Sequence, residues 1–347
     1  MKKIDFLRVV SLLLPGLLLL PGSQQRAQAA LNDARQACIL DLIENASSQL
    51  TMGEVRDICD AQETAADASD SAEQDSEAAG LVAERLSVDQ TNIYKPFTLM
   101  SHRTNYILLA AYNFQDWNAG IDESVYGEDD VNVDNTEVQF QLSVKIPLAA
   151  DLFQHRIDLF TGYTMRSFWQ LYDSENSSPF RETNHEPEFW VQARPQWEFL
   201  GIKNTLNILG INHMSNGQAG DSSRSWNRVY AAFTLGRGNF ALLVRPWLRI
   251  QEGAGDDDNP DITDYYGHGD LWLAYKHEEH TFSLMTRNNI ESGFSQGAVE
   301  LGWSFPIFNY PFLKGYIQYF SGYGESLIDY DRYVNRLGIG LQFTDIL

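Results

Sequence analysis

The segment EVQFQLSVKI, Glu137–Ile146, has the most regular polarity pattern in the chain. Apolar and polar residues alternate through it without a break, beginning with the pairs Glu137–Val138 and Gln139–Phe140. A strand turns alternate side chains to opposite faces of a sheet. The segment therefore predicts a β-strand with one apolar and one polar face.

Similar but less regular runs recur towards the C-terminus. They are 106–114, 156–172, 187–199, 205–215, 225–235, 240–251, 265–280, 281–289, 298–305, 313–323 and 335–343. With 137–146 they make twelve candidate strands, and bulky aromatic residues gather near the strand ends, among 8 Trp, 16 Tyr and 19 Phe. An even number of strands of about ten residues with aromatic ends is typical of an outer-membrane barrel. The barrel must close, because an open sheet edge is not tolerated in lipid.

This pattern predicts an all-β fold, a twelve-stranded antiparallel transmembrane barrel over residues 91–347. The alternation continues almost to the last residues, RLGIGLQFTDIL, as expected of a closing strand. The alternative is a secreted soluble β-domain, which would bury its apolar faces in one core.

The N-terminal residues carry an export signal. The chain begins MKKIDFLRVVSLLLPGLLLLPGSQQRAQAALND, with basic residues, an apolar run over Val9–Leu20 and the small-residue site Ala27–Ala29. This predicts a cleaved signal peptide over residues 1–29. The alternative is an uncleaved anchor, but the apolar run is short for a membrane span.

Two further segments separate the signal from the barrel. Residues 30–60 contain two short helical patterns and both cysteines, Cys38 and Cys59, so we expect a helical hairpin joined by a disulfide in an oxidising compartment. Residues 61–90 are rich in acids and poor in aromatics, which predicts a disordered acidic linker. We expect the N-terminal segment to lie in the periplasm.

The overall charge excludes one class of partner. The 347 residues carry a net charge of −22, from 25 basic and 47 acidic residues. Binding to phosphate backbones requires a basic surface, so nucleic acid is not an expected partner.

The stretch INHMSNGQAGDSSRSWNRVY, residues 211–230, holds the candidate catalytic residues. On a strand, His213 and Ser215 share a face with Ile211, the face expected to point towards lipid. A polar pair there is costly unless it is paired, which favours a function. Asn227, on the returning strand, could lie beside His213 and orient its ring, so that Ser215 would be a nucleophile and His213 its base.

Five motifs, in order, resemble the outer membrane phospholipase A family. In chain order they are SSPFRETNHEPEFW at 177–190, INHMSNG at 211–217, SRSWNR at 223–228, DDNPDI at 257–262 and SGYGESLIDY at 321–330. The resemblance covers about Asn105 to the C-terminus and implies a twelve-stranded barrel that hydrolyses acyl esters of phospholipids and lysophospholipids. It further implies a requirement for Ca²⁺ and activation by homodimerisation.

The resemblance also assigns the site residues. It implies Ser215 as nucleophile, His213 as base, Asn227 as the orienting residue and the Gly217 amide as an oxyanion donor. For Ca²⁺ it implies the Gln218 carbonyl, the Ser223 hydroxyl and Ser177 from the partner subunit. Asp258 matches a second, weaker calcium site. These are the hard oxygen ligands that calcium takes.

Other interpretations remain open at this stage. The polar cluster RETNHEP, with Arg181, Glu182, Thr183, Asn184 and Glu186, predicts a hydrogen-bond network that fills the lumen. A non-catalytic outer-membrane barrel, either a small porin or a structural protein, is the alternative to the enzyme. A soluble lipase would need a G-x-S-x-G elbow before a helix. The one such string, GFSQG around Ser295, lies in an expected turn between strands.

Overall fold

The computed structural model describes residues 80–95, 97–115, 133–155, 157–174, 178–195, 197–253, 255, 257–288, 292–308 and 310–344. The predicted signal peptide, the Cys38–Cys59 hairpin and most of the predicted linker lie outside these residues.

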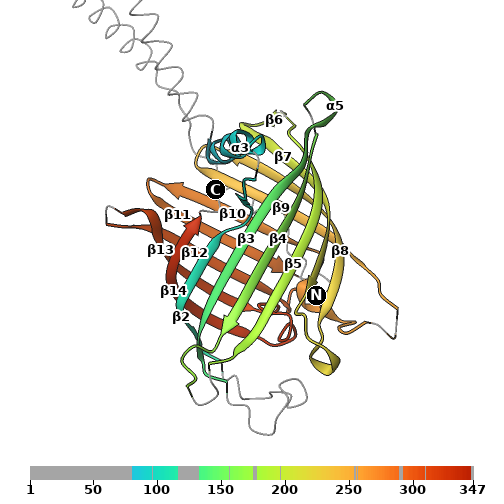
Figure 1. The fold of residues 1–347 in the computed structure, drawn as a ribbon, viewed down its shortest axis with the longest axis vertical. Coiled ribbons are helices and arrows are strands. Elements are labelled where there is room, and N and C mark those ends of the chain that lie inside the picture. The colour runs from blue at the N-terminus through green and yellow to red at the C-terminus, as the bar shows by residue number, and fades with distance from the viewer. Residues whose placement is uncertain are drawn as a thin grey trace, which may run out of the picture. The chain divides into compact units, whose positions relative to one another are not determined.

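Twelve long antiparallel strands in the described residues form a closed barrel (Figure 1). They are β2 (Asn105–Asn113), β3 (Thr136–Asp151), β4 (Ile157–Trp169), β5 (Phe180–Ala193), β7 (Ile202–Ser215), β8 (Ser225–Arg237), β9 (Phe240–Ile250), β10 (Gly269–His277), β11 (His280–Asn288), β12 (Gly297–Ile307), β13 (Tyr310–Gly322) and β14 (Val334–Thr344). Each pairs with its neighbour along the chain, and β14 pairs with β2 to close the ring. The predicted twelve-stranded barrel is confirmed.

Shorter elements complete the described chain. They are the two-residue strands β1 (Met100–Ser101) and β6 (Glu198–Phe199), the helices α3 (Gly80–Ile93), α5 (Leu152–His155) and α6 (Ile262–Tyr266), and the 3₁₀ turn η3 (Gly220–Ser222). No helix of the described chain has the length and apolar content that a membrane crossing requires.

Four strand boundaries differ from the predicted ones by four residues or more, including the end of β3 at Asp151 rather than residue 146 and the end of β5 at Ala193 rather than residue 199. Strand β5 begins at Phe180 rather than at residue 187, because the outward residues of its first half, Thr183 and His185, are polar like the inward ones and so give no apolar stripe. Strand β10 begins at Gly269 rather than at residue 265, because Ile262–Tyr266 form helix α6, for which Gly267 is the C-cap.

Helix α3 packs at the barrel end where β8 turns into β9. Val82 contacts Ala241 and Ala274, and Arg85 donates to the Ser101 carbonyl (2.5 Å). The predicted disordered linker over residues 61–90 is therefore helical in its last part. The sequence alone predicts that its charged residues face solvent. In the structure Arg85 bonds to Ser101 and Asp89 pairs with Lys145 at the end of the barrel.

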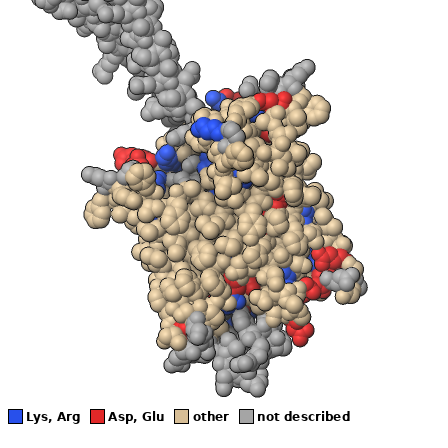
Figure 2. All heavy atoms as spheres, in the orientation of Figure 1, with Lys and Arg blue, Asp and Glu red and all other residues tan. Residues whose placement is uncertain are grey.

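The outer wall is apolar and the interior is polar. Alternate residues such as Leu209, Ile211 and Leu248 are exposed on the outside. On the visible face, charged side chains gather mainly towards the two ends of the barrel (Figure 2). This is the distribution expected of a wall that contacts hydrocarbon.

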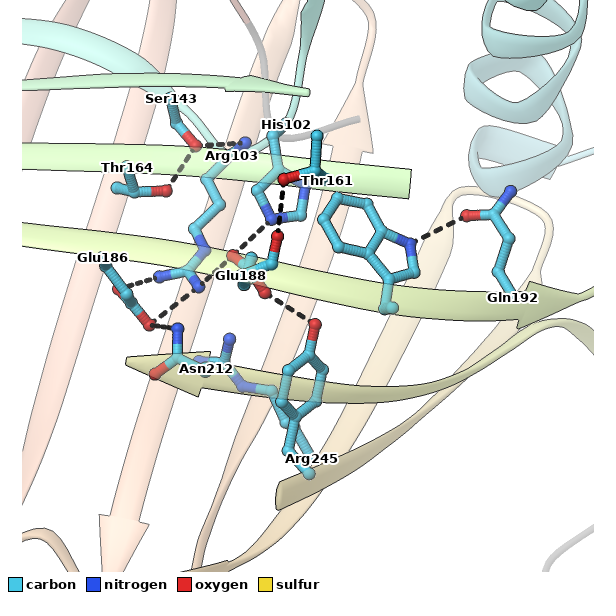
Figure 3. A network of polar contacts seen from close by, with 12 residues as sticks. His102, Arg103, Ser143, Thr161, Thr164, Glu186, Glu188, Gln192, Asn212 and Arg245 are labelled. Carbon is cyan, nitrogen blue, oxygen red and sulfur yellow. Dashed lines mark hydrogen bonds and ion pairs between the residues drawn. The ribbon is translucent and has the colours of Figure 1, made fainter. Parts of the chain in front are cut away.

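Ion pairs and hydrogen bonds join side chains inside the barrel (Figure 3). Arg103 donates to Glu186 Oε2 (2.6 Å) and to Glu188 Oε1 (2.8 Å), and Tyr230 donates to Glu188 Oε2 (2.6 Å). Nearer the other end of β5, Arg181 bonds to Glu137 and to Asp329. The network predicted for RETNHEP is confirmed for its Arg, Glu and Asn members, whereas Thr183 bonds to Ser167 (3.0 Å).

Candidate functional site

The β7–β8 hairpin brings the candidate catalytic residues together. His213 lies directly opposite Asn227, and Ser215 lies opposite Ser225. Because side chains alternate, Asn212 and Asn216 are buried inside the barrel, while His213 and Ser215 are half-buried on the outer face. The strand and the outward face are as predicted.

A hydrogen bond joins the imidazole and the carboxamide. His213 Nδ1 lies 2.9 Å from Asn227 Oδ1. Since a carbonyl oxygen only accepts, Nδ1 carries the proton and Nε2 is left as the basic nitrogen. On its other side, Asn227 Nδ2 donates to Glu252 Oε1 (2.7 Å), a contact that sequence reasoning missed.

The serine lies two residues further along the same face of β7. In the described structure its hydroxyl makes no hydrogen bond to His213. Hydrogen bonds between nucleophile and base often tighten only in the substrate complex. The shared face places the two groups suitably for that contact.

The loop after Ser215 is held by Asn216. The Asn216 Oδ1 atom accepts from the amides of Gln218 (3.2 Å) and Arg224 (3.0 Å), and Nδ2 donates to the Ser222 carbonyl (2.8 Å). The Asn216 amide donates to the Arg224 carbonyl (3.0 Å), which closes the loop at its base. This role was also missed, although the residue directly follows the candidate nucleophile.

Gly217 lies at the start of this loop in the left-handed region, with φ 67°. Glycine adopts this conformation without steric cost. Its amide makes no hydrogen bond within the described chain. A free backbone donor two residues after the candidate nucleophile is a candidate oxyanion donor.

The motif DDNPDI places Asp258 beside the same loop. Asn259 is fully buried, and its Oδ1 accepts from the amide of Ser225 (3.0 Å) at the start of β8. Asp257 accepts from Arg249 Nη2 (2.6 Å). These contacts on either side hold Asp258 where it accepts from the Ser223 hydroxyl (2.6 Å).

The predicted calcium ligands are therefore partly brought together. Ser223 and Asp258 are in contact, and Gln218 lies in the same loop with its carbonyl unbonded to the described residues. Ser177 lies outside the described residues. No group of three His, Cys, Asp or Glu is placed to hold a metal in the described ranges. The donor set of one carboxylate, one hydroxyl and one carbonyl fits a hard cation bound with modest affinity.

The alternative serine motif is structural. Ser295 lies in the turn between β11 and β12, and its hydroxyl donates to the Ser292 carbonyl (2.7 Å). A strand follows it, not a helix, so the elbow of a soluble lipase is absent here.

One further group near the site has a strongly shifted pKa. Tyr330, in the loop before β14, donates to Asp261 Oδ1 (2.5 Å). Burial, together with this acceptor and its negative charge, raises the pKa of the phenol far above its usual value.

The closed barrel with its apolar outer wall defines an integral outer-membrane barrel protein. The serine, histidine and asparagine on its outer face are side chains of the kind that ester hydrolases use. The model of the phospholipase A1 family matches residues 82–343, and the chain belongs to this family. It is accordingly a phospholipase, an ester hydrolase that acts on phospholipids at the outer membrane.

Similar proteins support this assignment. The phospholipase A1 of Klebsiella pneumoniae is 36% identical over 269 residues, which span 77% of this chain and 88% of the relative. The outer membrane phospholipase A of Escherichia coli matches with a TM-score of 0.66 and 36% identity, over 72% of this chain and 100% of that one. The crystal structure of the Salmonella typhi outer membrane phospholipase dimer with bound calcium matches with a TM-score of 0.67 and 36% identity, over 73% and 95% of the two chains.

Proposed function

We propose that the chain is a calcium-dependent serine esterase that cleaves acyl esters of phospholipids and lysophospholipids, as phospholipase A1 and A2, at the outer face of its barrel. Ser215 is the nucleophile, His213 the base, Asn227 the orienting residue and the Gly217 amide the oxyanion donor. The hydrogen bond from His213 to Asn227 on the lipid-facing side carries this proposal. A porin or a purely structural barrel has no use for such a pair there.

The mechanism follows from the positions of these groups. Ser215 Oγ attacks the ester carbonyl while His213 Nε2 accepts its proton. The carbonyl oxygen gains negative charge, which the Gly217 amide stabilises. The alkoxide of the glycerol leaves with the proton from His213, and an acyl-enzyme remains. Water, deprotonated by His213, then attacks the acyl carbon and releases the fatty acid and free Ser215.

Asn227 holds the imidazole through Nδ1 during both steps. As a neutral residue it orients the ring without adding a charge at the membrane boundary. The orientation matters because only the tautomer with a free Nε2 can accept the serine proton.

The calcium site of this proposal is built from the Gln218 carbonyl and the Ser223 hydroxyl, with Ser177 from the partner subunit, and Asp258 belongs to a second, weaker site beside it. Support comes from the Ser223–Asp258 contact and from the calcium in the Salmonella typhi dimer. When bound, the cation would add positive charge beside the oxyanion site. The Asn216 contacts keep the loop that carries these oxygens in shape.

Activation by homodimerisation is part of the same proposal. The acyl chains need an apolar groove, which two outer walls side by side would supply, and Ser177 would enter the site from the second copy. A variant locked as a monomer by interface substitutions should lose activity. Full activity in that monomer would contradict this part.

The direct test is fatty-acid release from mixed phospholipid–detergent micelles. Wild type should be active with calcium and inactive with chelator, and Ser215→Ala should be inactive in both. Ser295→Ala is the matched control and should behave as wild type, because its hydroxyl only bonds within a turn. Ser223→Ala and Asp258→Asn should both raise the calcium concentration required for half-maximal activity. Activity that survives in Ser215→Ala, or an inactive wild type with open-channel conductance, would contradict the proposal.

A further inference from the structure

The second partner of Asn227 suggests a fourth member of the site. Asn227 Oδ1 accepts from His213, and its Nδ2 donates to Glu252 Oε1 at 2.7 Å. Within the described residues each end of this amide has one partner. Glu252 follows β9 by two residues, and Ile250 at the end of β9 is the register partner of Asn227. Glu252 therefore lies on the outer face next to the β8 residue it contacts.

The chemistry of the carboxylate decides which way the amide points. The oxygen and nitrogen of an asparagine side chain have nearly the same shape, so the pocket alone does not fix its orientation. An ionised carboxylate only accepts hydrogen bonds, so the NH₂ group must face Glu252. The amide oxygen must then face His213, which places the proton on Nδ1 and leaves Nε2 unprotonated.

We propose that Glu252 is a positioning residue of the active site, which fixes the amide of Asn227 and through it the reactive tautomer of His213. This inference rests on the proposed Ser215–His213–Asn227 site. Glu252 also brings a negative charge to a neutral orienting residue. That charge favours the imidazolium that forms when His213 takes the serine proton.

The two functions of Glu252 can be separated by substitution. Glu252→Ala removes both the acceptor and the charge, so kcat should fall about tenfold with little change in KM, a loss of about 1.4 kcal/mol. Glu252→Gln keeps an acceptor oxygen but loses the charge. It should retain kcat within about threefold, and the acidic limb of its kcat/KM profile should move to lower pH, because the imidazolium loses a nearby negative charge.

Few other titratable side chains lie on the strands beside His213, where they could affect the pH profile. Beside His213, the outward residues of β8 are Ser225, Asn227 and Val229, none of which titrates in this range. On β5 the outward group is His185, opposite Ser215, whose Nδ1 is bonded to the Tyr163 hydroxyl (2.6 Å). The acidic limb of the kcat/KM profile should therefore move by the same amount when Glu252→Gln is introduced into the His185→Gln variant. A shift that persists there is assigned to His213.

A double-mutant cycle tests whether Glu252 acts through Asn227. In the Asn227→Ala background, Glu252→Ala should cause no further loss of kcat, since the amide it orients is gone. The matched control is Glu279→Ala, which removes an exposed acid at the turn between β10 and β11. This turn lies at the end of the barrel opposite the proposed site. It should be as active as wild type.

The outcomes separate this inference from the proposed function. Each variant is first shown to be folded by its migration on gels without heating. If Ser215→Ala is inactive but Glu252→Ala retains wild-type kcat, only the role of Glu252 is overturned. The same holds if Glu252→Ala costs as much without Asn227 as with it. If Ser215→Ala remains active, the proposed site fails and the role of Glu252 fails with it.

Discussion

Replacement of Asn216 by alanine should disable the site without touching any proposed catalytic group. Asn216 is 4% exposed and turns into the barrel, away from the substrate side. Its side chain holds the amides of Gln218 and Arg224 and the carbonyl of Ser222. Alanine leaves these three backbone groups without their partner, so the loop that carries Gly217 and Gln218 loses its fixed geometry.

The magnitude follows from the three bonds. Each contributes about 0.5–1.5 kcal/mol net, and the exposed Gln218 amide can turn to water instead. A loss of about 2 kcal/mol in transition-state binding corresponds to a fall in kcat/KM of about 30-fold. Asn216→Asp should do no better, because it keeps the acceptor but turns an oxygen towards the Ser222 carbonyl and the Glu182 carboxylate.

The assay is fatty-acid release from mixed micelles over a range of calcium concentrations, on variants shown to be folded. Asn207→Ala is the matched control, because Asn207 lies on the same strand with an Oδ1 that has no hydrogen-bond partner in the described chain. It should retain wild-type kcat/KM. Wild-type kcat/KM in Asn216→Ala, or an equal loss in Asn207→Ala, would refute the reasoning.

Three further predictions follow from other contacts. Glu137→Ala leaves two buried guanidinium groups without their shared carboxylate and should lower the free energy of unfolding by about 3–5 kcal/mol, measured by urea denaturation in lipid vesicles; a change below about 1 kcal/mol would contradict this. Gly217→Ala places a Cβ at φ 67° but only in ordinary contact with its surroundings, so the backbone strain should lower the free energy of unfolding by about 1 kcal/mol in the same urea assay, and an unchanged stability would contradict it. Because the pKa of Tyr330 is raised in the folded state, its contribution to stability is complete below the usual tyrosine pKa of about 10 and is lost above it. The stability difference between wild type and Tyr330→Phe should therefore be constant below that pH and shrink above it in unfolding curves, whereas a difference independent of pH would contradict this.

The barrel was predictable because lipid imposes one rule on every strand. The outward residues must be apolar, so the period of two in Glu137–Ile146 repeats around the ring. The rule does not constrain the residues that face the lumen. The predictions were wrong for two segments whose side chains mainly contact the lumen, the first half of β5 and helix α3. The first half of β5 shows polar residues at alternate positions because they pair with each other across the lumen. Helix α3 was missed for the same reason, since Lys145, the partner of its Asp89, comes from a distant strand.

The arrangement of the proposed catalytic residues was predictable for a local reason. His213 and Ser215 are two residues apart on one strand, and a loop of about nine residues returns Asn227 to a position opposite His213. Asn216 follows the serine directly, but its partners depend on how the loop closes. Glu252 comes from another strand, so only the register of β8 with β9 reveals its contact.

The alternation along β7 explains how a site on the lipid-facing wall remains ordered. The outward residues His213 and Ser215 are half-buried on the lipid-facing wall. The inward residue Asn212 of β7 donates to Glu186 (2.9 Å; Figure 3). It also accepts from Arg228 (2.6 Å). The lumen network thus fixes the backbone of the strand from behind. Side chains packed inside the barrel therefore support, from the inner face, a strand whose outer face is exposed to lipid and carries the proposed site.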